Sequence, residues 1–188
     1  MKKFELTSEF VTFLGKTLFR IKALVSFGDV AEGELGGFIE RENNLDQSGD
    51  AWVSGDAKVC GDAQVYGDAW VSGDAKVCGD AQVYGDAWVS GDAWVSGDAK
   101  VCGDAQVYGD AWVQNCRDYS ATSCFGSENR TTTFFRTKDG GISVRCGCFY
   151  GTLREFREKV KERHGDSRLA KEYLMLADLM EFRLSKDE

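Results

Sequence analysis

Apolar and polar positions follow a fixed six-residue cycle through the middle of the chain, from Gly49 to Gln114. Each of the eleven hexapeptides begins Gly-Asp-Ala and has Val at its fifth position. In an extended segment the Ala and Val point to one face, and the residue after each of them points to the other. Gly-Asp can then turn the chain, because Gly tolerates unusual φ and Asp hydrogen-bonds turn backbone. The cycle predicts short strands with Ala and Val buried inside a coil.

The outward residues repeat every eighteen positions, which indicates three hexapeptides per coil, with coils stacked about 4.8 Å apart. Like residues are then expected to form columns: Trp52, Trp70 and Trp88; Lys58 and Lys76; Gln64 and Gln82; Tyr66 and Tyr84. A duplicated GDAWVS unit at Gly91 breaks this phase and rotates every later residue by one face. Trp94 and Trp112 are therefore expected to follow the lysines, Lys100 to follow the glutamines and Gln106 to follow Trp88.

A period of six excludes the heptad of a coiled coil and is typical of hexapeptide β-helices. The array resembles left-handed parallel β-helices, whose triangular coils are each built from three hexapeptides. The expected fold is mainly β, a left-handed parallel β-helix with an N-terminal β-hairpin cap and a C-terminal ββαα module. The expected boundaries are 1–34 for the hairpin cap, 35–125 for the β-helix and 126–188 for the C-terminal module.

The flanking segments carry their own periodicities. Residues 3–11 and 17–26 predict a hairpin, and 33–39 with 44–45 predict an imperfect first coil. After the array, residues 131–137 and 141–146 predict a second hairpin. Thr152 and Glu155 form a capping-box pattern that opens a helix ending at Gly165, and a second helix is expected after Ser167.

Composition changes this picture in two ways. The formal charge of −8 equals that of the array alone, which has three Lys against eleven Asp. We therefore expect the protein to attract a basic protein but not nucleic acid or an anionic membrane. The seven Cys are an odd number, and the first residues lead into a strand pattern rather than a signal-peptide core. We therefore expect reduced thiols and a cytoplasmic location.

The candidate binding surface combines the aromatic columns with one row of corner aspartates: Trp52, Trp70, Trp88, Trp94, Trp112, Tyr66, Tyr84, Asp50, Asp68 and Asp86. Stacked aromatics stabilise exposed sheet through cross-strand pairs. They also form contact patches when a surface leaves several of them bare. The aspartates suit turns, and as acidic edges they could also mimic a phosphate backbone or collect divalent cations.

Candidate chemistry is sparse. Hexapeptide acyltransferases use a histidine base at the solenoid, whereas the one histidine here, His164, is predicted at a helix end. Cys146 and Cys148 are predicted on one strand, where they could join Cys116 or Cys124 around zinc or remain small buried thiols. Cys60 and Cys78 should stack within disulfide reach. No phosphate-binding loop is present, and no cofactor or metal site is predicted.

Three segments together carry a family resemblance: Leu35–Glu40, the GDAxVx array, and Phe134–Gly140 with Cys146–Phe149. They resemble phage and prophage hexapeptide-repeat proteins of Gram-positive bacteria, described as polymer-forming cytoskeletal or hexapeptide-transferase-like. The resemblance implies a β-helix, a phage origin and a tendency to form dimers or trimers, but no activity. We therefore expect a non-enzymatic binding protein that inhibits a host or anti-phage defence component in the infected cell. The alternatives are capture of a small nucleotide signal between subunits, and acyl transfer.

Overall fold

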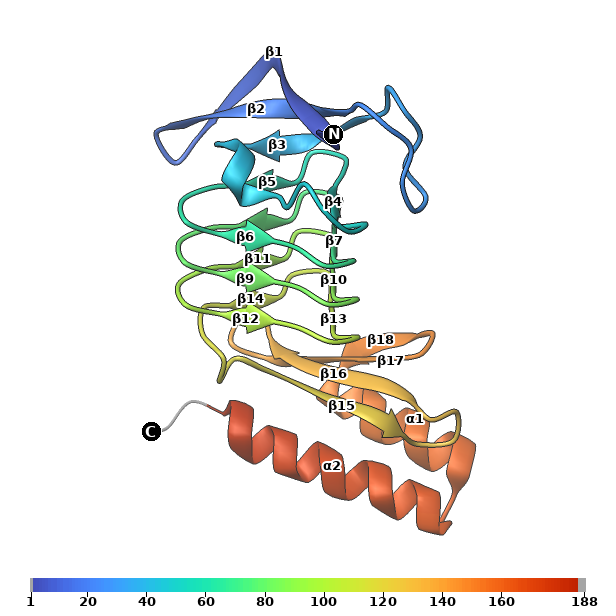
Figure 1. Cartoon of the computed structure of the whole chain (residues 1–188). Helices are drawn as coiled ribbons and strands as arrows, with labels where there is room; N and C mark the ends of the chain where they lie inside the picture. The colour runs from blue at the N-terminus through green and yellow to red at the C-terminus, as the bar shows by residue number, and fades with distance from the viewer. Residues whose placement is uncertain (1, 186–188) are drawn as a thin grey trace.

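The chain forms a parallel β-solenoid of about four coils, closed by antiparallel strands at one end and by a sheet with two helices at the other (Figure 1). This computed structural model describes residues 2–185.

The solenoid has three faces, named here after the residues that begin their outward columns. The tryptophan face holds β4 (Trp52–Val53), β7 (Trp70–Val71), β10 (Trp88–Val89) and β13 (Gln106–Val107). The lysine face holds β5 (Lys58–Val59), β8 (Lys76–Val77), β11 (Trp94–Val95) and β14 (Trp112–Val113). The glutamine face holds β6 (Gln64–Val65), β9 (Gln82–Val83) and β12 (Lys100–Val101).

The interior follows the prediction from the six-residue cycle. Every Ala and Val of the array is at most 1% exposed, and together they form one continuous core. The predicted column order is also confirmed, including the rotation at Gly91. Trp52, Trp70, Trp88 and Gln106 pair in turn along one face, and Trp94 pairs with Lys76 and Trp112 on the next.

Every corner glycine of the array has a positive φ, and at most corners the next coil also leaves little room for a Cβ. Gly91, for example, has φ 74°, and a Cβ there would lie 2.9 Å from the backbone nitrogen of Gly109 one coil below. Real Cβ atoms are not found at such contacts with backbone, and a positive φ strains any side chain. The corners of successive coils can therefore stack only as Gly on Gly.

The N-terminal cap continues the lysine face upward. β1 (Phe4–Phe13) and β2 (Lys16–Ala23) form the predicted hairpin, β2 pairs antiparallel with β3 (Leu35–Ile39), and β3 pairs parallel with β5. A short 3-10 helix, η1 (Glu42–Asn44), leads to Leu45, which pairs with Val65 and completes the imperfect first coil. The tip of the hairpin descends beside the solenoid, so that the ring centroids of Phe13 and Trp94 lie 5.9 Å apart.

The C-terminal module contains more β-structure than the sequence predicted. The predicted hairpin is present as β16 (Arg130–Arg136) and β17 (Ile142–Cys146), but β15 (Tyr119–Phe125) and β18 (Phe149–Thr152) flank it to make four antiparallel strands. The expected ββαα order was therefore two strands short. The helices α1 (Leu153–His164) and α2 (Arg168–Leu184) pack on this sheet through a core that includes Phe134, Phe156 and Tyr173. Among residues 2–185, neither helix is long and apolar enough to cross a membrane.

Hydrogen bonds between coils all run in one direction, so the two ends of the solenoid expose different backbone groups. Donor side chains cap one end and acceptor side chains cap the other. The N–H groups of Trp52, Lys58 and their equivalents donate to Ala carbonyls of the next coil, so these carbonyls point toward the N-terminal end. At that end donor side chains replace the missing coil: Lys3 Nζ donates to the Ala51 carbonyl (2.8 Å), and Asn44 Nδ2 donates to the Ala63 carbonyl (2.8 Å).

At the C-terminal end the unpaired groups are N–H donors, and oxygen-bearing side chains accept from them. Thr133 Oγ1 accepts from the Gln106 N–H (3.0 Å), and Asp118 Oδ2 accepts from the N–H groups of Gln114 (2.9 Å) and Asn115 (3.1 Å). Asp118 is itself buried and lies 3.2 Å from the Arg136 guanidinium, which offsets its charge. Buried backbone groups at both ends are thereby satisfied.

The column order makes deletions within the array predictable. Removing residues 67–84 takes out one whole coil and brings Trp112 to the level that Trp94 occupies beneath Phe13. Removing only residues 79–84 rotates the later units and brings Lys100 there instead. We expect the six-residue deletion to melt at a lower temperature than the eighteen-residue one, because it loses an aromatic pair worth roughly 0.5–1.5 kcal/mol.

Thermal unfolding followed by circular dichroism tests this order. Phe13→Ala is the matched control, since it removes the aromatic pair and should lower the melting temperature of the natural chain and of the eighteen-residue deletion more than that of the six-residue deletion, where only its packing against Leu18 and Phe38 is lost. Equal melting temperatures for the two deletions would contradict the column assignment.

Candidate interaction surface

The tryptophan column passes from fully buried to exposed along the solenoid. Trp52 is fully buried and Trp88 is 50% exposed, with Trp70 between them. The sequence predicted that Trp52 would be exposed, and that prediction is wrong because the N-terminal cap covers it. The rings of Phe4 and Phe27 pack edge-on against Trp52, at 6.4 and 5.4 Å between centroids. Trp52 therefore belongs to the core, and the exposed surface begins below it.

A column of serines orients the indoles. Each serine follows Val in its hexapeptide, so it points outward beside the tryptophan of the neighbouring coil. Trp70 Nε1 donates to Ser54 Oγ at 3.1 Å, and Trp88 Nε1 donates to Ser72 Oγ at 3.4 Å. These bonds tie each indole to the coil above it and satisfy its polar atom. Among the described residues, the Trp52 Nε1 is buried without a hydrogen-bond partner.

The lower end of this face forms a hollow of about 460 Å³, lined by residues that include Trp88, Gln106, Tyr108 and Arg145. Tyr108 takes the place of serine there because the duplicated unit at Gly91 rotated the later hexapeptides. Its ring is 43% exposed and meets Tyr150 edge-on at 5.2 Å. Arg145 donates to Gln106 Oε1 at 3.0 Å and lies 5.8 Å from the Tyr108 ring centroid.

Two acidic edges border the tryptophan face. The edge shared with the glutamine face carries Asp50, Asp68, Asp86 and Asp104, and the edge shared with the lysine face carries Asp56, Asp74, Asp92 and Asp110. All eight are exposed. The Asp50 N–H donates to the Asp68 carboxylate at 3.1 Å, which agrees with a role in the turn. The structure therefore places an aromatic patch between two rows of negative charge.

The remaining candidate residues lie on the other two faces. Tyr66 and Tyr84 stack on the corner that follows the glutamine face, with centroids 4.9 Å apart and ring planes 1° apart. Trp94 and Trp112, at 5.0 Å, lie half-buried on the lysine face, beside the hairpin tip. The predicted residues thus do not form one surface. Trp70, Trp88 and the row Asp50, Asp68 and Asp86 share the tryptophan face or its border, and Trp52 lies on the same face but is buried under the cap. The stacked pairs Tyr66–Tyr84 and Trp94–Trp112 lie elsewhere.

Three members of the patch were missed from the sequence. Tyr108 could have been found, because the phase shift at Gly91 places it directly below Ser90 on the tryptophan face. Arg145 and Tyr150 come from β17 and β18, which reach this face only through the docking of the C-terminal sheet. No periodicity within the array signals that contact.

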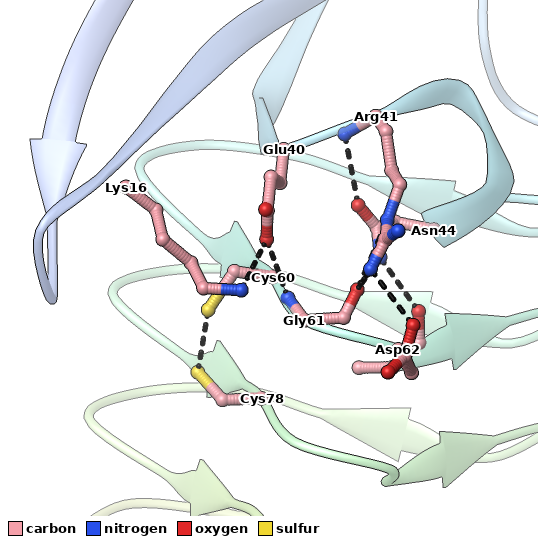
Figure 2. A network of polar contacts seen from close by, with 9 residues as sticks. Lys16, Glu40, Arg41, Asn44, Cys60, Gly61, Asp62 and Cys78 are labelled. Atoms are coloured by element: carbon pink, nitrogen blue, oxygen red, sulfur yellow. Dashed lines mark hydrogen bonds and ion pairs between the residues drawn. The ribbon is translucent and has the colours of Figure 1, made fainter.

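A polar network fastens the hairpin tip to the lysine face, and Figure 2 shows it above the stacked thiols of Cys60 and Cys78. Lys16 Nζ lies 2.8 Å from Glu40 Oε2, and the same oxygen accepts from the Gly61 N–H at 2.6 Å. The hydrogen bond from Lys16 holds the pKa of Glu40 below its ordinary value. The network therefore depends on an ionised Glu40.

Cys146 and Cys148 do not lie on one strand as the sequence predicted. Cys146 ends β17 and accepts from Thr132 Oγ1 at 3.2 Å, whereas Cys148 is exposed in the turn that follows, so the two do not share a strand. Within residues 2–185 no three His, Cys, Asp or Glu side chains gather in a group that could hold a metal ion. The Cys60 and Cys78 thiols are buried with sulfurs 3.2 Å apart, as free cysteines.

The fold and this surface define a repeat-solenoid protein. Within the array, residues 63–79 and 81–97 match the family model described as YdcK Beta solenoid repeat. The match agrees with the coils seen here and is confined to them. No curated protein matches the chain.

The Glu40 network predicts how the thiols become accessible. Replacing Glu40 by Gln removes the charge that holds Lys16, so the hairpin tip should open more often and Cys60 and Cys78 should react faster with a maleimide. Because the pKa of Glu40 is depressed, its contribution is present at neutral pH and is lost as pH falls through the folded-state pKa. Acid should therefore open the tip as well.

Labelling followed by peptide mass spectrometry measures this rate. Glu42→Gln is the control, since Glu42 pairs with Lys2 at 2.7 Å in an exposed position of the same cap. Unchanged labelling in Glu40→Gln, or an equal increase in Glu42→Gln, would show that the network does not hold the tip.

Proposed function

We propose that the chain is a non-enzymatic binding and scaffold protein that holds a basic protein partner on its tryptophan face. The observation that carries this proposal is the exposed pair Trp88 and Tyr108 between two continuous rows of aspartates. Aromatic side chains supply most of the binding energy at many protein interfaces, and charge at the rim guides the partner to them. A surface with both features fits Lys or Arg side chains that lie over the rings.

Three properties of the solenoid suit this role. The core of Ala and Val fixes the rungs, so the outward residues are held in place before a partner arrives. Ser72 accepts a hydrogen bond from the Trp88 indole at 3.4 Å, which favours one orientation of the ring. The fold also spaces charges regularly along each edge, which favours an extended basic segment over a compact ion.

The resemblance to phage hexapeptide-repeat proteins supports a more specific proposal. The partner would be a host protein or an anti-phage defence component in the cytoplasm of an infected bacterium, and binding would inhibit it. Acidic rows at coil spacing could compete for a surface that normally binds a polyanion. This context rests on the resemblance, and the patch itself would serve any basic partner.

Two other functions are kept as competing proposals. A small nucleotide signal could be captured between subunits. The chain could also be a hexapeptide acyltransferase, but the solenoid contains no histidine to serve as the general base. His164, the one histidine, ends α1 and stacks on Tyr173 at 5.7 Å within the C-terminal module. Turnover of an acyl-CoA by the purified chain would favour the enzyme over the binding protein.

Self-association into dimers or trimers is part of the proposal. A second exposed apolar surface lies on α2, separate from the tryptophan face. It is a row of Met175, Leu179 and Phe182, which are 69%, 56% and 86% exposed. Positions 175, 179 and 182 fall on one side of a helix, so a second copy could cover all three at once.

The binding surface is tested by capture from bacterial lysate and then by titration with the captured protein. Trp88→Ala is expected to weaken binding roughly 30-fold, in line with about 2 kcal/mol for a central aromatic contact. Gln64→Ala, at the same outward position on the glutamine face, should change little. Asp86→Asn with Asp92→Asn should weaken binding and flatten its salt dependence, whereas Asp80→Asn with Asp98→Asn on the far edge should not.

A partner that binds equally well to both pairs of variants would refute the tryptophan face as the site. A partner lost only with the far-edge pair would move the site to the opposite edge.

Self-association is tested separately by sedimentation. The natural chain is expected to form a dimer or trimer at micromolar concentration, and Phe182→Glu is expected to dissociate it because a charge would be buried at the contact. Arg154→Glu, an exposed change on α1, is the control. A natural chain that sediments as a monomer at high micromolar concentration would remove this part of the proposal.

A further inference from the structure

A separate cavity of about 320 Å³ lies within the C-terminal module, away from the solenoid surface. Its walls come from the loop between β15 and β16, the turn between β17 and β18, the second half of α1 and Tyr173 of α2. Pockets for small ligands begin at roughly this size, and they combine an apolar lining with a few polar groups. The cavity has both.

The floor is aromatic and held by its own contacts. Phe156 and Phe125 each meet Tyr173 edge-on, with ring centroids 5.8 and 5.4 Å away. The Phe149 ring is tilted against Phe156 at 5.6 Å. The Tyr173 hydroxyl accepts from the Ser127 N–H at 3.1 Å, which fixes the ring and leaves its own O–H to donate. Flat faces and edges of this kind suit a planar ring.

The rim is basic although the protein is acidic. Arg130, Lys159 and Arg163 line the opening, against one carboxylate, Glu128. Lys159 pairs with Glu162 at 2.8 Å, whereas Arg130 and Arg163 form no ion pair with any residue between 2 and 185. Basic residues in the last turn of α1 also offset the partial negative charge of that helix end.

We propose that this cavity binds a small planar anion, with its ring on the aromatic floor and its carboxylate or phosphate group against Arg163 and Arg130. Guanidinium groups bind both anions through paired N–H donors, and a partly enclosed site strengthens such bonds. Glu128 can accept from an N–H or O–H donor on the ring. The site is complete within one chain, so it differs from nucleotide capture between subunits and does not depend on the tryptophan face.

Calorimetric titration of the full chain tests the site with three probes: adenosine monophosphate, 2-naphthoate and inorganic phosphate. At least one ring-bearing anion is expected to bind at least tenfold more tightly than inorganic phosphate. Binding of the nucleotide alone identifies a phosphate-bearing ligand, and binding of naphthoate alone identifies a carboxylate. Absence of binding by both ring anions, or equal affinity for inorganic phosphate, overturns the proposal.

Variants then locate the bound anion. Arg163→Gln is expected to weaken binding about tenfold or more. Lys161→Gln is the control: it removes the same charge from an exposed position on the same helix, but Lys161 does not line the cavity, so binding should change little. Equal losses in both would mean that only net charge matters, and would overturn the site. Phe149→Ala should weaken the ring anion without changing the weak binding of phosphate.

Protection of Cys148 gives a second measurement that does not depend on the variants. Cys148 lines the cavity and is exposed, and Cys116 is exposed outside it. A bound ring anion should slow the reaction of Cys148 with a maleimide and leave Cys116 unchanged. Unprotected Cys148 at saturating probe would show that the anion binds elsewhere.

Discussion

The direction of the hydrogen bonds between coils is the constraint on which the rest of the structure depends. A parallel coil offers carbonyl oxygens to one side and N–H groups to the other, so a stack of coils has chemically different ends. Lys3 and Asn44 bring donors to the N-terminal end, and Thr133 and Asp118 bring acceptors to the C-terminal end. Burial lowers the pKa of Lys3, while the charges of Asp46 and Asp50 oppose that effect and help to keep it a cation. The two caps are therefore not interchangeable.

Between the caps, the residues that stabilise the fold are different from the residues that form the surface. The buried positions are restricted to Ala and Val by the narrow interior, and the corners to Gly by stacking. The outward positions are restricted by neither. They can carry tryptophan, lysine or glutamine on the same backbone, and the patch around Trp88 and Tyr108 uses that freedom. A substitution on this surface is expected to affect binding far more than folding.

The sequence predicted the solenoid, its column order and the rotation at Gly91, because each depends only on local periodicity. It did not predict burial of Trp52, which depends on Phe4 and Phe27 folding back over the first coil. It also missed β15 and β18. The apolar alternation of residues 119–125 is interrupted at Ser123, and Gly147 and Gly151 interrupt the segment before α1, so pairing with β16 and β17 is needed to make them strands. Long-range packing determines both those strands and the cavity that they enclose.

The extra hexapeptide at Gly91 shows how such a molecule can change over generations. Nearly identical units encourage slippage during DNA replication, which gains or loses whole units. A gain of three lengthens the column and leaves each face as it was. A gain of one unit keeps the Ala and Val core yet changes which outward residues lie on each face below it, and with the extra unit at Gly91, Tyr108 lies beside Trp88. One added unit can thus present a new surface with no mutation in the core.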